Sequence, residues 1–338
     1  MKAKYIFIAA LAAVAMLNTS CEKVSPQGVL MGNTAVEDRV KMSYEYYLKN
    51  NFEDKLDYDL KDAKDGYSFL VGGDSHVTTD PGRMKEMFQI GLDNDDMLLI
   101  HLGDIADTKV EYYNVLQNAI TDAKSNYVDK YYEYHDDGML YRKGKPEAIG
   151  HNYEDIRYPF FPVVGNHDLT HNGWALWSNI FGSSFYEFDI YVDDDENGMP
   201  LFDHFIFLDT ASGTLGKTQV DLIEQGVLDG ENSYRYTFVF SHTNIFLPQH
   251  LQFASTFPRE EAYFLLKQFD KWNASIVFCG HVHKWDEQVF NAVYFLTLDS
   301  MSERNSPKPG DYLVRVNIDK DGALDIEKVH MSYVAPKN

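Results

Sequence analysis

The feature that most limits how this chain can fold is an apolar run, Phe160 to Val164, that ends abruptly in Gly165, Asn166, His167 and Asp168. A short apolar run bounded by Pro and Gly predicts a buried strand. Polar groups just past the C-terminal end of such a strand face the crevice where open α/β sheets bind ligands. The same residues could form a plain turn in which Asn and Asp bond to their own backbone, so this run alone does not decide between the two.

Four other apolar segments end in the same way. The motif Asp74-x-His76 follows residues 67–71, and Gly103-Asp104 follows residues 97–102. Further along, His242 follows residues 236–240, and His281-x-His283 follows residues 275–279. A helix predicted over residues 80–92 separates the first two segments, which argues for a parallel βαβ unit. Any one of these side chains could be a turn residue or a core histidine bonded to backbone. Together they place the side chains of a metal site at one edge of a sheet.

This order and these spacings resemble the calcineurin-like metallophosphoesterases, whose pattern D-x-H, G-D-x-x-D, G-N-H-D/E, H and G-H-x-H is met at all five places. The resemblance covers residues 66 to 300 and implies a four-layer α/β/β/α sandwich of two mixed sheets flanked by helices. It also implies a centre of two divalent metal ions. One ion would take Asp74, His76 and His283, the other would take Asn166, His242 and His281, and Asp104 would bridge them.

The resemblance implies a mechanism as well. A hydroxide bridging the metals would attack phosphorus, His167 would protonate the leaving oxygen as general acid, and Asp168 and Asp107 would orient these groups. Imidazole and carboxylate ligands suit Mn, Zn, Fe or Ni and do not choose among them. The related purple acid phosphatases carry Tyr where this chain has Asp107, which argues against an iron–tyrosinate centre.

The charge of the chain bears on its substrate. The net charge of −22 and the pI of about 4.8 repel polyanions, so a nucleic acid polymer is not expected. Two metal ions would create a local positive charge that attracts a small phosphate ester, the leading substrate class. The alternatives are a phosphodiesterase for lipid head groups or nucleotides, and a non-catalytic surface lipoprotein that keeps the fold. The complete set of ligands speaks against the second alternative.

The N-terminus predicts export from the cytoplasm. Residues 1–4 are basic and residues 5–17 form an apolar run too short for a comfortable membrane span, so residues 1–20 are interpreted as a signal peptide. Cys21 follows where a bacterial lipoprotein signal would be cut, although Asn18 departs from the usual small or apolar choice there. On this interpretation the only membrane contact is a lipid anchor at Cys21. An ordinary secretory signal, giving a periplasmic or secreted protein, is the alternative.

The remaining chain is divided into a tether with a peripheral helix, 21–65, and a catalytic domain, 66–338. Within the domain, residues of about 136–157 look like a structureless insertion that could form one wall of a substrate pocket. Residues 185–191 and 203–209 predict a hairpin, whereas 292–298, 312–318 and 324–329 predict three strands of a closing sheet. Cys279 lies in an apolar run, so no structural disulfide is expected. Nothing in the sequence indicates an oligomeric state.

Overall fold

The computed structural model describes residues 35–50, 63–150, 152–153, 156–246, 257–302 and 312–334. The predicted signal peptide, Cys21 and most of the tether lie outside the described residues. Within these ranges, no helix combines the length and the apolar character needed to span a membrane.

The first of two mixed sheets has five strands. Their order is β14 (Leu324–His330), β13 (Tyr312–Asp319), β1 (Gly66–Gly72), β2 (Leu98–His101) and β6 (Phe160–Pro162). Strands β1, β2 and β6 are parallel, whereas β13 runs antiparallel to β1 and β14 antiparallel to β13. The predicted βαβ unit is confirmed, because α4 (Gly82–Asp93) connects β1 to its parallel neighbour β2.

The second sheet has six strands. Their order is β11 (Asp286–Phe290), β12 (Val293–Thr297), β10 (Ile276–Cys279), β9 (Ser233–Ser241), β8 (Pro200–Phe207) and β7 (Tyr186–Asp194). The four inner strands are parallel, and the two edge strands are antiparallel to their neighbours. The predicted hairpin is confirmed as the pair β7 and β8.

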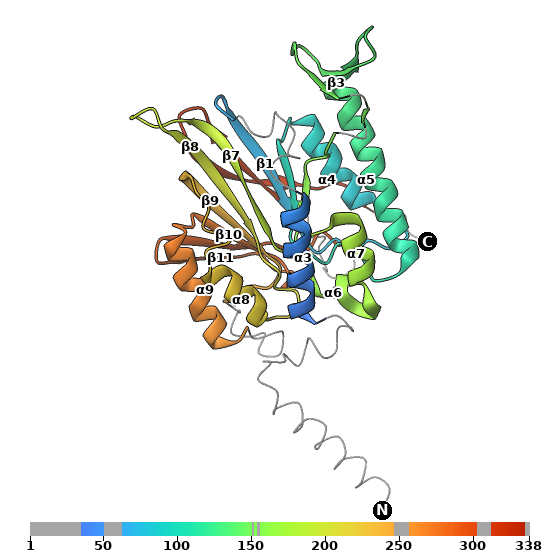
Figure 1. The fold of residues 1–338 in the computed structure, drawn as a ribbon. Helices are drawn as coiled ribbons and strands as arrows, with labels where there is room; N and C mark the ends of the chain where they lie inside the picture. The colour runs from blue at the N-terminus through green and yellow to red at the C-terminus, as the bar shows by residue number, and fades with distance from the viewer. Residues whose placement is uncertain are drawn as a thin grey trace, which may run out of the picture.

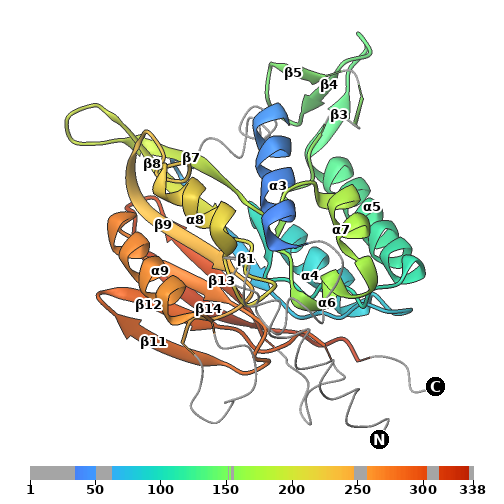
Figure 2. The same ribbon diagram turned by 60° about the horizontal axis from the view of Figure 1, so that its bottom comes forward.

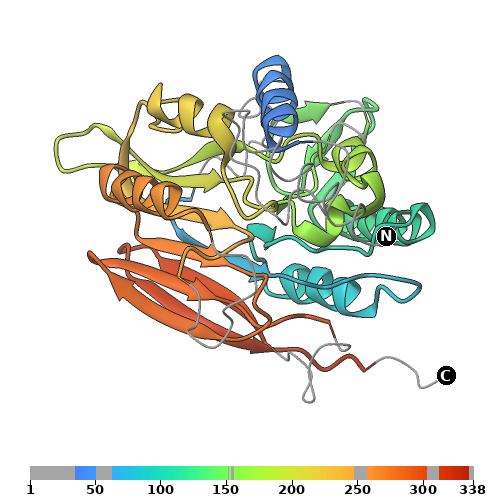
Figure 3. The ribbon, with the colours of Figure 1, turned by 90° about the horizontal axis from the view of Figure 1, so that it is seen from below.

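Helices cover the outer face of each sheet. The five-stranded sheet is covered by α4, α5 (Val110–Tyr131), the short α6 (Asn166–Leu169) and α7 (Trp174–Phe181). The six-stranded sheet is covered by α3 (Val36–Asn50), α8 (Gly216–Glu224) and α9 (Arg259–Lys271). Seen along the layers in Figure 3, and from the sides in Figures 1 and 2, the molecule is the predicted four-layer α/β/β/α sandwich.

Phenylalanine rings fill the space between the two sheets. Phe69 of the five-stranded sheet meets Phe205 and Phe238 of the other sheet edge-on, at ring centroid distances of 5.4 and 5.0 Å. Phe240 and Phe278 stack beside them with centroids 5.2 Å apart. All five rings are fully buried. Closely packed rings leave little freedom for the sheets to slide, so the strand ends of both sheets are held beside one another.

The prediction of one closing sheet from the last three strands is right for the last two, which pair with each other, and wrong for the first. Residues 292–298 form β12 in the six-stranded sheet, whereas β13 and β14 belong to the five-stranded sheet. An alternating pattern identifies a strand but not its partner, and β13 pairs with β1 from the opposite end of the chain. Strand β11 was not predicted, because its residues DEQVF are largely polar and mostly exposed.

The prediction that residues 136–157 are structureless is also wrong. They continue a small antiparallel sheet of β3 (Tyr132–Tyr134), β4 (Leu140–Arg142) and β5 (Ala148–Gly150), anchored by the buried Leu140. This sheet follows α5, which starts beside the strand ends and runs for 22 residues, about 33 Å at 1.5 Å per residue. The small sheet therefore lies at the far end of α5 in Figure 1.

Candidate metal centre

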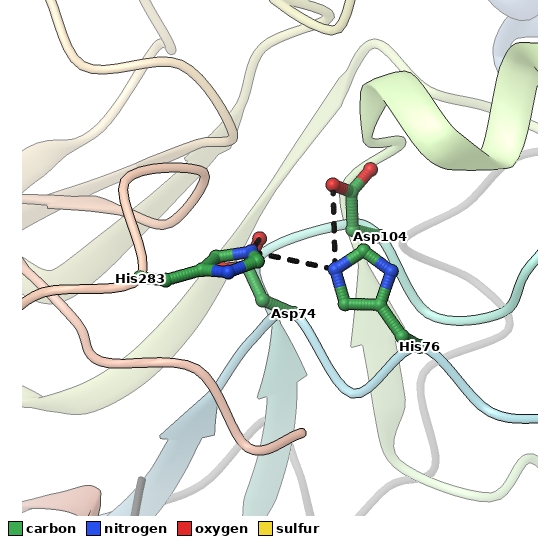
Figure 4. A group of neighbouring side chains, drawn as sticks. All are labelled: Asp74, His76, Asp104 and His283. Atoms are coloured by element: carbon green, nitrogen blue, oxygen red, sulfur yellow. Dashed lines mark hydrogen bonds and ion pairs between the residues drawn. The ribbon is translucent and has the colours of Figure 1, made fainter. Parts of the chain in front are cut away.

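All seven predicted metal ligands converge at the C-terminal ends of strands from both sheets. Their ligating atoms form two groups in which every atom lies within 4.8 Å of the others: Asp74, His76, Asp104 and His283 in one, and Asp104, His242 and His281 in the other. Figure 4 shows the four side chains of the first group pointing toward one another. The amide oxygen of Asn166 joins the second group, 2.9 Å from Nε2 of His242. Asp104 belongs to both groups.

The backbone of this region is held in an unusual conformation. A positive φ is uncommon for residues other than glycine and destabilises the chain by about 1–3 kcal/mol per residue. Asp74 and His76 are two residues with positive φ, and hydrogen bonds to a neighbouring loop hold both. The N–H of Asp74 donates to the carbonyl oxygen of Gly103 and the N–H of His76 donates to that of Asp104, both at 3.0 Å. Five candidate ligands have positive φ: Asp74 (53°), His76 (45°), Asp104 (53°), His281 (69°) and His283 (54°).

Two motif glycines allow the loops to approach so closely. A Cβ atom on Gly165 would lie 2.0 Å from the backbone nitrogen of Asp104. A Cβ atom on Gly103, whose φ is +87°, would lie 2.8 Å from Nδ1 of His242. Both contacts are too short for real atoms. The glycines in the Gly-Asp and Gly-Asn-His motifs are therefore required by the spacing between the ligands.

The donor set fits a divalent cation, because several side-chain oxygen and nitrogen atoms converge on one point. The Nδ1 atom of His242 lies 2.7 Å from the carbonyl oxygen of Leu102, so Nδ1 carries the proton that this bond needs. In the neutral ring Nε2 is then an acceptor, yet it faces Asn166 Oδ1 at 2.9 Å and Asp104 Oδ2 at 3.5 Å. Nε2 is also 3.1 Å from Nδ1 of His281. A metal ion satisfies such converging lone pairs together, and its histidine ligands commonly donate their other N–H to a carbonyl.

The charges of these groups influence one another strongly. Burial by itself lowers the pKa of His242, but the Asp104 carboxylate outweighs it and raises that pKa to about 9. Burial would raise the pKa of Asp104, yet the surrounding imidazoles, His242 foremost, hold it well below its usual range. Burial and the neighbouring His242 lower the pKa of His281 to about 4. The region thus favours ionised Asp104 and neutral His281, which are the forms that bind metals, whereas His242 favours its protonated form and would release a proton when a metal binds.

His167 occupies the solvent side of the site. Its side chain is 50% exposed, its ring lies edge-on to that of His76 at 4.6 Å, and its backbone N–H donates to Asp104 Oδ1 at 2.6 Å. Asp107 Oδ1 lies 3.4 Å from Nδ1 of His76 and 4.0 Å from Nδ1 of His167. One carboxylate thus faces a candidate ligand and the predicted general acid together.

Asp168 lies beneath the site, where it fastens loops together. Its Oδ2 accepts the N–H of Gly165 at 2.8 Å, and its Oδ1 accepts the N–H groups of Ile105 and Ala106 at 3.0 and 3.3 Å. The hydroxyl of Tyr113 also donates to Oδ1, at 3.2 Å. Burial and the nearby Asp104 raise the pKa of Asp168 to about 7. These contacts place Asp168 as a positioning residue for the loops that carry Asp104 and Asn166.

Two threonines that hold the site were not predicted from the sequence. Thr210 Oγ1 accepts the backbone N–H of His242 at 3.0 Å, and Thr108 Oγ1 donates to the carbonyl oxygen of His167 at 2.5 Å. A lone Thr after a strand is too common to attract notice. The available signal was the pair Asp209-Thr210, which ends one more apolar strand, β8, at the same edge.

Fold and site together define a layered α/β protein whose strand-end loops gather imidazoles and carboxylates suited to divalent metals. The chain belongs to the calcineurin-like phosphoesterases, because the sequence profile of that family matches residues 67–285, more than half of the chain. The protein is accordingly a metallophosphoesterase, as the motifs predicted.

Several solved structures resemble the chain at low sequence identity. GAP50, the anchor in the inner membrane complex of Plasmodium, is 14% identical with a TM-score of 0.48, over 79% of this chain and 90% of that one. A dimetal phosphatase from Danio rerio is 11% identical with a TM-score of 0.39, over 79% and 99%. A putative 5'-nucleotidase from Staphylococcus aureus is 11% identical with a TM-score of 0.44, over 80% and 55%. No curated protein matches the chain significantly.

Proposed function

We propose that this metallophosphoesterase uses two divalent metal ions to hydrolyse small phosphate esters. The observation that supports two ions is the shared position of Asp104, whose Oδ2 lies 3.8 Å from Nε2 of His76 in one group and 3.5 Å from Nε2 of His242 in the other. Two ions held in this way would activate a water molecule and neutralise charge on the phosphoryl oxygens.

The chain's own residues would hold the reacting groups in place. His242 is oriented by its bond to the carbonyl of Leu102. Nε2 of His283 lies 3.1 Å from Asp74 Oδ1, which places these two proposed ligands of one ion side by side. His167 is the proposed general acid, because it is the exposed imidazole beside the two groups and can reach a bound ester from the solvent side. Asp107, whose Oδ1 lies 4.0 Å from Nδ1 of His167, would orient the ring while the proton passes to the leaving oxygen.

The proposal includes export and anchoring. The basic start, the apolar run and Cys21 support a lipoprotein whose catalytic domain acts on small esters outside the cytoplasm. A Cys21→Ser variant of the full chain is expected to leave the membrane fraction and to stop incorporating labelled fatty acid. Unchanged membrane association together with no label in the wild-type chain would overturn the anchor and leave the catalytic proposal untouched.

The catalytic proposal is tested by measuring hydrolysis of a chromogenic phosphate monoester and of its diester counterpart by the purified chain. Activity should disappear with a chelator and return with Mn or Zn, and a His167→Ala variant should be nearly inactive with its metals still bound. A preference for the diester would make the protein a phosphodiesterase for lipid head groups or nucleotides. Two bound metals without turnover of either ester would favour the non-catalytic surface protein.

A further inference from the structure

Helix α3 precedes the part of the chain that the family profile matches, yet it is fastened to the catalytic domain by a buried arginine. Arg39 is 1% exposed. Its Nη2 donates to Oδ1 of Asp209 at 2.9 Å and its Nε donates to Oδ2 at 3.2 Å, while Nη2 also reaches Oγ of Ser212 at 3.1 Å. A guanidinium that holds a carboxylate with two bonds fixes the orientation of that carboxylate as well as its position.

Both the side chain and the backbone of Asp209 form further hydrogen bonds. Ser184 Oγ donates to its Oδ2 at 2.8 Å. The side-chain amide of Gln219 accepts the N–H of Asp209 at 3.0 Å and donates to its carbonyl oxygen at 2.8 Å. Asp209, Ser184 and Gln219 are all fully buried. Removing one partner from a buried network leaves the remaining charge or polar atoms unpaired at a high cost in free energy, so we expect the loop that follows β8 to depend on the arginine from α3.

The next residue carries this arrangement to the candidate metal centre. Thr210 Oγ1 accepts the backbone N–H groups of His242 and Thr243 at 3.0 and 2.9 Å. The hydroxyl of Thr243 donates back to the carbonyl oxygen of Thr210 at 2.8 Å. The position of the His242 backbone is therefore set by the same loop that Arg39 holds, through a direct sequence of contacts from Arg39 to Asp209, Thr210 and His242.

Two further contacts attach α3 to α8 and to Ser184, which precedes β7. The Glu37 carboxylate accepts the N–H groups of Lys217 and Thr218, both at 2.6 Å, at the start of α8. These N–H groups have no partner within the helix, and a negative charge is favourable there. Ser43 Oγ lies 3.0 Å from Ser184 Oγ and accepts the N–H of Ser184 at 3.0 Å. Helix α3 is thus attached at three points around the β8–α8 loop.

We propose that α3 is a working part of the catalytic unit and that Arg39 is a positioning residue for the metal ligand His242. This inference rests on the proposed two-metal centre and adds a requirement to it. Loss of the Arg39 fork would free the β8–α8 loop, move Thr210, and shift the His242 imidazole relative to Asp104 and Asn166. The expected defect is weaker metal binding in the group that contains His242.

The chain offers a matched control for this experiment. Arg315 is 8% exposed and holds Asp96 with the same kind of fork, Nε to Oδ1 at 2.8 Å and Nη2 to Oδ2 at 3.0 Å. Asp96 precedes β2, at the edge of the sheet away from the candidate ligands. Arg39→Lys and Arg315→Lys in the full chain should both lower the unfolding temperature, since each loses a buried bidentate bond.

The deciding measurement is metal content and affinity, by chelator competition with Mn or Zn, together with kcat and KM. Arg39→Lys should bind the second metal equivalent at least about tenfold more weakly, the effect expected for residues that support a ligand, and should lower kcat more than it changes KM. Arg315→Lys should bind both equivalents like the wild-type chain. Equal metal affinity in the two variants would overturn the inference.

A second pair of variants avoids the charged fork altogether. Thr210→Val keeps the shape of the side chain but removes the oxygen that accepts the N–H of His242, whereas Thr210→Ser keeps that oxygen. We expect weakened metal binding in the valine variant and its recovery in the serine variant. Wild-type binding by Thr210→Val contradicts the inference. A wild-type chain that binds no metal defeats the proposed function and this inference together, whereas an active wild-type chain with unaffected variants defeats the inference alone.

Discussion

The described part of the chain contains a second cluster of histidine and carboxylates whose comparison with the candidate metal centre is instructive. Glu187, Asp189 and His204, here called the strand cluster, also place their ligating atoms within 4.8 Å of one another. They lie on one face of the hairpin β7–β8, where Asp189 pairs directly with His204. His204 is 1% exposed, and the side chains of the two acids are 12% and 11% exposed. By composition and burial, both clusters could bind a metal.

The two clusters differ in which side-chain groups face one another and in the backbone conformation that carries them. In the strand cluster a single imidazole faces carboxylates. Nε2 of His204 contacts Glu187 Oε2, so one proton serves this pair, whereas Asp189 Oδ1 lies 3.9 Å from Nε2 and has no hydrogen-bond partner among the described residues. Tyr234 stacks on the ring at 4.4 Å. In the candidate centre, imidazole faces imidazole and an amide oxygen, on backbone with positive φ. The candidate centre is therefore distinguished from the strand cluster by imidazoles that face one another and by backbone with positive φ, which the regular strands lack.

The largest expected effect compares one carboxylate from each cluster. Asp104→Asn should lower ester hydrolysis more than about a hundredfold and release bound metal, because the effect of losing a bridging ligand exceeds the effect of losing an outer partner. Glu187→Gln should keep two metals and full activity. The measurement is metal analysis of the purified variants alongside their rates. Metal loss in Glu187→Gln would show that the strand cluster binds metal after all and would break the comparison.

The next largest effect concerns proton transfer without metal loss. His167→Gln should lower kcat by about 10²–10⁴-fold, the usual contribution of a general acid, while binding two metals as tightly as the wild-type chain. His204→Gln in the strand cluster is the control and should leave kcat unchanged. Esters with better leaving groups should be less affected, because their leaving oxygen needs no proton. An equal loss for good and poor leaving groups would argue against the general-acid role.

A smaller effect is expected from the carboxylate that faces both His76 and His167. Asp107→Asn removes the charge at 3.4 Å from Nδ1 of His76 and at 4.0 Å from that of His167. Metal affinity or kcat should fall by about 10–100-fold, as is typical for partners that orient a ligand. Chelator competition measures the metal affinity by itself, so a loss of affinity can be told apart from a loss of kcat in the metal-loaded variant. Wild-type values for both would show that this carboxylate supports neither imidazole.

The smallest effect is a change in stability in the strand cluster. Burial raises the pKa of Asp189 above the usual 3.8, although His204 opposes this. The folded wild-type chain therefore loses stability as pH rises through that raised pKa, and Asp189→Asn does not. The variant should match the wild type at about pH 4 and exceed it by no more than about 1 kcal/mol at pH 7. Unfolding by urea across this pH range would reveal it; a less stable variant at pH 7 would contradict the prediction.

The sequence predicted those parts of the site that depend on short motifs at the end of a single strand. Each ligand motif ends its own apolar strand, so hydrophobic period and turn residues were enough to place Asp74, Asn166 and His281 at one edge. Partners that meet across long separations left no local pattern. Arg39 and Asp209 are 170 residues apart, and neither neighbourhood shows that the two side chains touch. The same reason explains why residues 292–298, which form β12, were assigned to the wrong sheet, since strand pairing is decided by contacts that periodicity does not record.

The position of the small β3–β5 sheet provides a site for attaching a label to the enzyme. The turn between β3 and β4, residues 135–139, is largely exposed and lies at the far end of α5 from the catalytic edge. Exposed loop tips of this kind tolerate inserted sequence well. A fluorophore or affinity peptide placed in this turn would leave the entrance to the catalytic edge uncovered. The protein could thus be immobilised on a surface or followed by microscopy while its turnover is measured.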